Sequence, residues 1–129
     1  MNLLRSAIKS LQKTFRSFRF AIRGIGFVIQ YENNTRIHLL ASLAAIVAGM
    51  LLKLNYIEWT IIITQIVLVW SAEAFNSAIE KIVDFISPEF HPKAGAIKDI
   101  AAGAVLFIAM GAAITGLIIF GHKIWILVA

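Results

Sequence analysis

Several residue types that carry chemistry in other proteins are scarce or absent in this sequence. Cysteine is missing, which excludes disulfides, thiolate metal sites and cysteine nucleophiles. Charged residues make up only 15% of the 129 residues, whereas hydrophobic residues make up 60%. A soluble domain of this length needs far more polar surface to face water. We therefore expect lipid, rather than water, to surround much of the chain.

The few charges are uneven in sign and in position. The net charge is +5, and an excess of positive charge commonly indicates binding to nucleic acid, to an anionic membrane or to acidic substrates. Because the basic residues gather near the N-terminus, beside hydrophobic segments, we favour a membrane surface and expect no nucleic acid partner. Residues 1–36 lack a clean apolar stretch, so we expect no cleavable signal peptide.

Residues 1–30 are predicted to form an amphipathic helix that lies in the membrane interface. Its apolar stripe, spaced by three and four residues, consists of Leu4, Ile8, Leu11, Phe15, Phe18, Ile22 and Ile25. Its basic stripe consists of Arg5, Lys9, Lys13, Arg16, Arg19 and Arg23. Such a helix can rest on lipid headgroups with its apolar face buried. The alternative is an ordinary amphipathic helix packed on a partner.

Three further segments are hydrophobic enough to cross a membrane, at about 37–56, 58–86 and 98–121. About 20 residues suffice for one crossing, so the last two turns of the second helix should emerge from the bilayer. Residues 87–97 contain both prolines and are predicted to form a loop. The sequence thus predicts a single all-α membrane domain over residues 1–129.

The orientation follows from the distribution of Lys and Arg. Most of them lie in residues 1–36, and three more lie in residues 81–98, whereas the opposite ends of the predicted spans carry only Lys53 and Lys123. Positive residues stay predominantly on the cytoplasmic side. We therefore expect the N-terminus and the 81–98 region to face the cytoplasm.

Polar residues within the second span form a pattern. Glu73, Asn76, Glu80 and Asp84 follow one another at spacings of three and four, which places them on one face of a helix. Ionisable groups at membrane depth are unfavourable and commonly mark functional sites. This face is therefore the predicted location of the chemistry.

The predicted topology brings Glu32, Lys98 and Asp99 to the same cytoplasmic end. Glu32 and Glu80 could share a hard cation such as Mg²⁺, and Lys98 could bind a phosphate as a point charge. Glu73 lies deeper, where a poorly hydrated carboxylate is suited to accept a proton from an alcohol. Phosphoryl transfer requires a metal ion, a positive charge for the phosphates and a base, held together in a site with little water.

Spacing alone leaves other functions open. Three carboxylates on one helical face would also suit a small, multimeric, proton-coupled transporter, although a transporter normally holds its carboxylate near the bilayer midplane. A structural membrane anchor is a third possibility. Gly24 and Gly26 do not form a nucleotide-binding loop, because a third glycine and a preceding strand are missing.

The motifs themselves resemble those of the prokaryotic diacylglycerol kinase family, which includes the undecaprenol kinases. The segment Glu73-Ala-Phe-Asn76-Ser-Ala-Ile-Glu80-Lys-Ile-Val-Asp84 matches the family pattern E-x-x-N-[ST]-A-[IV]-E-x-x-[VI]-D. Residues 87–105 (SPEFHPKAGAIKDIAAGAV) and residues 32–36 (ENNTR) match two further blocks in the same order. The resemblance extends over roughly residues 15–120.

The resemblance implies a homotrimeric lipid kinase of the bacterial cytoplasmic (inner) membrane, with one interfacial helix and three transmembrane helices. It would transfer the γ-phosphate of ATP, with Mg²⁺, to undecaprenol or to diacylglycerol. By this resemblance Glu73 would be the catalytic base and Asn76 would orient the reacting groups. Glu32 and Glu80 would hold Mg²⁺ and the nucleotide, and the nucleotide site would be completed by Lys98, Asp99 and His91. Two further residues, Arg36 and Asp84, match family positions with less defined roles.

Two positions depart from the family pattern. Ile97 stands where Ala usually precedes Lys-Asp, and His38 stands where the Gram-negative diacylglycerol kinases have Glu. The segment Arg36-Ile37-His38 is more similar to the undecaprenol kinase branch. The sequence therefore favours a polyprenol acceptor over diacylglycerol.

Overall fold

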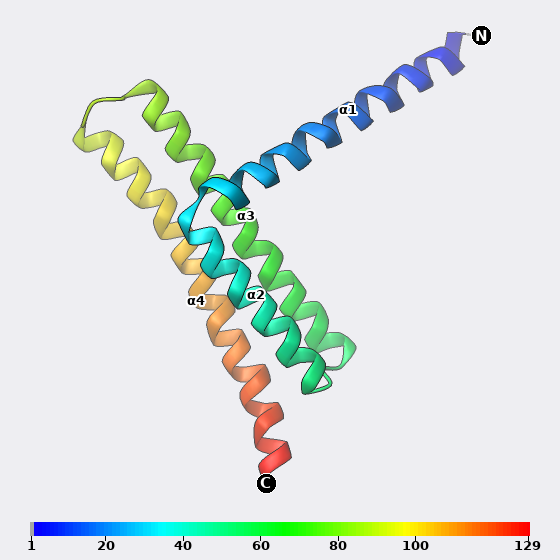
Figure 1. Cartoon of the computed structure of the whole chain (residues 1–129), viewed down its shortest axis with the longest axis vertical. Coiled ribbons are helices and arrows are strands. Elements are labelled where there is room, and N and C mark those ends of the chain that lie inside the picture. The colour runs from blue at the N-terminus through cyan, green and yellow to red at the C-terminus, as the bar shows by residue number, and fades with distance from the viewer. Residues whose placement is uncertain (1) are drawn as a thin grey trace. The chain divides into compact units, whose positions relative to one another are not determined.

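The computed structural model describes residues 2–129 as four helices. These are α1 (Asn2–Tyr31), α2 (Asn33–Leu51), α3 (Tyr56–Ile86) and α4 (Pro92–Val128) (Figure 1). Within the described residues there is no strand, and α2, α3 and α4 are each long and apolar enough to cross a membrane. The predicted all-α membrane fold with three spans is confirmed. The chain divides into two compact units, Met1–Glu32 and Asn33–Ala129.

The first unit is a single helix of 30 residues that separates apolar from basic side chains. From Arg5 to Phe27 every side chain is exposed, including Phe15 and Phe18 on the predicted apolar stripe. The side chain of Leu4, the first member of that stripe, lies outside the described part. An exposed apolar stripe beside a basic one fits a membrane interface.

A short turn that is stabilised by side chains joins α2 to α3. The Asn55 side chain accepts hydrogen bonds from the backbone N–H groups of Ile57 and Glu58, at 2.9 and 3.0 Å. The Glu58 carboxylate in turn accepts from the Asn55 backbone N–H at 2.7 Å. This reciprocal capping satisfies donors that the first turn of any helix leaves without partners. It fixes the residue at which α3 begins.

The loop between α3 and α4 is shorter than the sequence predicted. Helix α4 begins at Pro92 rather than near residue 98, so the predicted loop over 87–97 is wrong for its second half. Proline is tolerated in the first turn of a helix, where its missing N–H has no intrahelical partner to lose. His91 caps this helix, because its Nδ1 accepts a hydrogen bond from the Lys93 backbone N–H at 3.2 Å. At its other end α4 continues to Val128, beyond the predicted limit.

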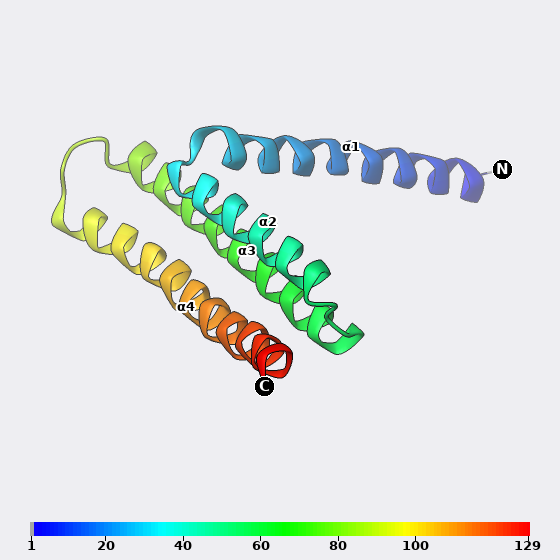
Figure 2. The ribbon, with the colours of Figure 1, turned by 60° about the horizontal axis from the view of Figure 1, so that its bottom comes forward.

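Helices α2, α3 and α4 run antiparallel to one another in turn (Figure 2), so that in Figure 1 α2 descends, α3 ascends and α4 descends. The α3–α4 hairpin makes the most extensive packing, while α2 lies mainly along α3 and touches α4 less. The buried residues of α3 form one stripe: Ile62, Val69, Glu73, Asn76, Ser77 and Val83. At the end remote from the loop, Lys123 of α4 pairs with Glu58 of α3 at 3.0 Å.

Gly49 of α2 lies against the start of α3 and yields a stability prediction. A Cβ at this position would stand 2.9 Å from Trp59 Cη2 and 3.0 Å from Leu54 Cδ1. We expect Gly49→Ala to lower the free energy of unfolding by about 1–3 kcal/mol, because the packed indole must move. Thermal unfolding in detergent micelles measures the change.

Gly111→Ala is the matched control, since a Cβ there meets nothing within 4 Å. It should be neutral or slightly stabilising, because Ala favours a helix more than Gly does. Equal losses in the two variants would contradict the packing described for Gly49.

Candidate functional site

The candidate site is built on the buried polar face of α3. Glu73 is 2% exposed and Asn76 is 6% exposed, and Glu80 is half-buried one turn further on. The Asn76 side-chain N–H donates to Glu80 Oε1 at 3.0 Å. Asp84, the last member of this face, is 62% exposed. Exposure to water therefore rises along about 16 Å of helix, at 1.5 Å per residue.

Glu73 has a partner on the neighbouring helix that the sequence did not predict. His38 Nε2 of α2 lies 3.7 Å from Glu73 Oε2, and the His38 side chain is only 16% exposed. The sequence singled out His38 as a departure from the family pattern but did not place it beside the carboxylate. Spacing within one helix cannot indicate which residue faces it from another.

Two buried oxygens on α3 have unfilled hydrogen-bonding capacity. Asn76 Oδ1 and Ser77 Oγ have no hydrogen-bond partner among the residues that the structure describes. Buried polar atoms are normally satisfied, so such exceptions commonly indicate a ligand or an ion. Ser77 was overlooked in the sequence because a serine within a helix is unremarkable. Its place after Asn76, at the Ser/Thr position of the family pattern, was the available signal.

The residues predicted to hold Mg²⁺ are only partly brought together. Glu80 supplies a carboxylate beside the Asn76 amide, and such oxygens are the ligands that Mg²⁺ prefers. Within residues 2–129, no group of three or more His, Asp or Glu is arranged to hold a metal ion. Glu32 belongs to the first compact unit, so its pairing with Glu80 stays a prediction.

At the wetter end, α3 and α4 are joined by an ion pair. Lys98 Nζ lies 2.5 Å from Asp84 Oδ1. Both residues line a pocket of about 180 Å³ under the α3–α4 loop, together with Glu89 and His91. The loop is short, so the start of α4 is held beside the end of α3. The pocket offers a cation and polar groups next to water.

Two other predicted site residues lie on exposed surfaces. Asp99 is exposed on the turn of α4 that carries Lys98. Arg36 is exposed on the first turns of α2. Their predicted roles in nucleotide or substrate binding remain predictions.

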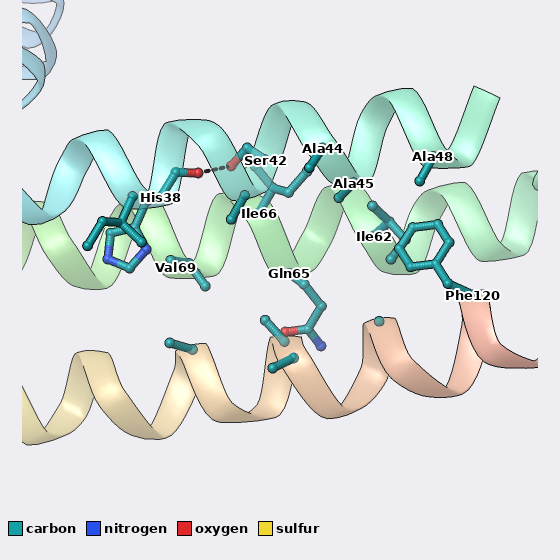
Figure 3. Close-up of a pocket in the computed structure, with 16 residues that line it drawn as sticks. His38, Ser42, Ala44, Ala45, Ala48, Ile62, Gln65, Ile66, Val69 and Phe120 are labelled. Carbon is teal, nitrogen blue, oxygen red and sulfur yellow. Dashed lines mark hydrogen bonds between the residues drawn. The ribbon is translucent and has the colours of Figure 1, made fainter. Parts of the chain in front are cut away.

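An apolar groove of about 550 Å³ runs between α2, α3 and α4. Figure 3 shows it extending from His38 at one end toward Phe120 at the other. Its walls are mostly small or aliphatic side chains, among them Ala41, Ala45 and Ala48 of α2 and Ala109, Ala112 and Gly116 of α4. Small side chains leave room that a hydrocarbon chain can fill.

A hydrogen-bonded link ties the two helices that carry His38 and Glu73. The Trp70 indole N–H donates to Ser42 Oγ at 3.1 Å. Ser42 Oγ donates in turn to the His38 backbone carbonyl at 2.7 Å (Figure 3). Trp70 and Ser42 were not singled out from the sequence, because each is an ordinary residue within an apolar span.

A family profile described as prokaryotic diacylglycerol kinase matches residues 19–120. The chain belongs to this family. It is 43% identical over 114 residues to the undecaprenol kinase of Bacillus subtilis (strain 168), covering 88% of this chain and 93% of that protein.

Two diacylglycerol kinases of other bacteria are more distant. The chain is 38% identical over 101 residues to that of Synechocystis sp., covering 78% of this chain and 58% of that protein. It is 39% identical over 75 residues to that of Escherichia coli (strain K12), covering 58% and 62%. Family membership supports a lipid kinase over the transporter that the carboxylates alone left open.

The Trp70–Ser42 bond yields a prediction for stability. Trp70→Phe removes the indole donor and keeps an aromatic ring, so we expect a loss of about 1 kcal/mol in the free energy of unfolding. Trp125→Phe is the matched control, since Trp125 is exposed near the end of α4. Thermal unfolding of both variants in the same detergent measures the difference. A Trp70 variant as stable as the control would show that the bond contributes nothing.

Proposed function

We propose that this protein is an ATP- and Mg²⁺-dependent kinase that phosphorylates a lipid alcohol, undecaprenol or diacylglycerol, at the cytoplasmic face of the bacterial inner membrane. The observation that carries the proposal is the burial of Glu73 at the dry end of a polar face whose wet end holds Lys98 and Asp84. The two ends match the two substrates. The lipid hydroxyl would reach the dry end from the bilayer, and the nucleotide would reach the wet end from water.

Glu73 is the proposed general base. Its carboxylate accepts the proton of the lipid hydroxyl while that oxygen forms a bond to the γ-phosphorus of ATP. The bond from this phosphorus to the bridging oxygen breaks, and ADP leaves. Because Glu73 is nearly inaccessible to water, water is a poor competitor for the phosphoryl group.

The nucleotide phosphates are proposed to bind at the wet end of the site. Lys98 offers a positive charge there, now paired with Asp84. Such a pair between partly exposed groups is weak, so phosphate oxygens can replace the carboxylate. His91 and Asp99 lie within eight residues of Lys98 along the chain and are proposed to complete the nucleotide site.

The donor set fits a magnesium ion. Glu80 is proposed to hold it with Glu32, and the buried Asn76 Oδ1 is a further oxygen that lacks a hydrogen-bond partner among the described residues. When bound, Mg²⁺ would neutralise charge on the phosphate oxygens. Asn76 also binds Glu80 through its amide N–H, so it would hold that carboxylate in place.

Undecaprenol is the acceptor that we propose first. The relative from Bacillus subtilis is named for that substrate and is 43% identical. In addition, the groove between α2, α3 and α4 is lined almost wholly by apolar side chains, which suits part of a long hydrocarbon chain. Diacylglycerol, which carries two chains, is the second candidate.

We propose one integral-membrane domain that assembles as a homotrimer with a cytoplasmic N-terminus. The distribution of Lys and Arg supports the orientation. Large apolar side chains are exposed along all three spans, for example Leu40, Phe75 and Phe107, and these surfaces can face lipid or neighbouring subunits. Chemical cross-linking in native membranes would detect trimers.

Glu73→Gln is the sharpest test of the reaction. We expect turnover to fall by at least ~10³-fold, because the amide cannot accept the proton, while the melting temperature stays close to that of the original protein. Transfer of radiolabelled phosphate from ATP to lipid in mixed micelles measures the rate. Glu58→Gln, at the opposite end of the spans, is the control and should keep most of the activity. Full turnover by the Glu73 variant would remove it as the base.

A side-by-side assay decides the acceptor. With ATP and Mg²⁺ in excess, we expect kcat/KM to be higher for undecaprenol than for diacylglycerol, because the relative with 43% identity is named for undecaprenol. A higher value for diacylglycerol would reverse this assignment. Failure of both lipids to gain phosphate would refute the kinase proposal itself.

A further inference from the structure

The proposed reaction leaves one half-buried group beside the base without a role. His38 faces Glu73 across the α2–α3 contact, with Nε2 3.7 Å from Oε2. That separation is slightly longer than a direct hydrogen bond, and such contacts in a substrate-free site often tighten once substrate binds. A buried carboxylate in an apolar bundle gains from any donor within reach.

The backbone of His38 is linked to α3 through Ser42. Its backbone carbonyl accepts from Ser42 Oγ at 2.7 Å, and Ser42 Oγ accepts from the Trp70 indole at 3.1 Å. Trp70 precedes Glu73 by three residues, on the same side of α3. The helices are thus linked by the Trp70–Ser42 hydrogen bond, and His38 approaches Glu73 one turn further along α3.

His38 also stands at the boundary between groove and carboxylate. It lines the apolar groove (Figure 3), where the other polar side chains are Ser42 and Gln65. No other charged or titratable group among the described residues lines that groove. A lipid chain in the groove would therefore place its headgroup end next to His38 and Glu73.

We propose that His38 is a positioning residue that orients the Glu73 carboxylate. In this role the Nε2–H approaches Oε2 when substrate is bound, and the carboxylate held in this way accepts the proton of the acceptor hydroxyl. His38 exchanges no proton in this arrangement and fixes only the rotamer of the base. The inference rests on the proposed function, because it assigns Glu73 its role.

Paired substitutions separate the Nε2 donor from the bulk of the ring. In His38→Gln the side-chain amide nitrogen can stand near the place of Nε2, whereas in His38→Asn it falls short. We expect His38→Gln to keep kcat within about 3-fold, and His38→Asn to lose about 100-fold, the effect of misplacing a catalytic group by an ångström or so. KM for ATP should change less than 2-fold in both variants, since the nucleotide binds elsewhere.

Melting temperatures and a distant histidine provide the controls. His122→Asn alters an exposed residue near the end of α4 and should leave kcat unchanged. If His38 only filled space, kcat would follow the loss of stability, and the Asn and Gln variants would not separate. Equal kcat in these two variants at equal stability would overturn the proposal.

A spectroscopic measurement tests the contact without relying on activity. The chain has 3 histidines, so ¹⁵N-histidine labelling in micelles gives few ring signals, and loss of one in His38→Gln assigns it. Glu73→Gln should shift the His38 Nε2 signal and leave those of His91 and His122 unchanged. An unmoved His38 signal would refute the contact. A shifted signal in a protein that phosphorylates no lipid would refute the kinase function and the positioning role, while the contact would stand.

Discussion

Placing the Glu73 carboxylate in an apolar bundle is the constraint on which the rest of the site depends. Removing a carboxylate from water costs several kcal/mol unless polar neighbours compensate. Along α3 the neighbours change stepwise, from Glu73 and Asn76, both buried, to half-buried Glu80 and exposed Asp84. One helical face thus connects a dry end to a wet end. Phosphoryl transfer between a nucleotide and a lipid needs both environments within a few turns.

The short α3–α4 connection aligns the second half of the site with the first. Helix α3 ends at Ile86 and α4 starts at Pro92, so the first turns of α4 lie beside the last turns of α3. Lys98 therefore meets Asp84 rather than a deeper carboxylate. At the other end of the same two helices Glu58 and Lys123 form a second ion pair, and the hairpin is closed at both ends. The packing of α3 against α4 places the proposed nucleotide end a few helical turns from the base.

The helices could be predicted from the sequence, whereas the way in which α2 and α3 are aligned with each other could not. The spans and the polar face of α3 follow from local patterns, hydropathy over about 20 residues and spacings of three and four. The start of α4 was missed because Pro92 suggests a break, although proline also suits a first helical turn. The contacts of His38 with Glu73 and of Trp70 with Ser42 depend on how two apolar helices slide and rotate against each other. Alternating Leu, Ile and Ala do not specify that register, whereas one polar bond across the interface does.

The register of α2 against α3 sets both the packing of α2 and the position of the apolar groove relative to Glu73. Because α2 lies mainly along α3 and touches α4 less, an apolar groove remains between them. Close approach at Gly49 and Trp59 fixes α2 near the start of α3, and the Trp70–Ser42 hydrogen bond fixes it near the middle of α3. The groove wall is therefore anchored on α3, the helix that carries the base, and any hydrocarbon lying in the groove is positioned relative to Glu73. Entry of a lipid between α2 and α4 would displace few existing contacts and leave the α3–α4 hairpin intact.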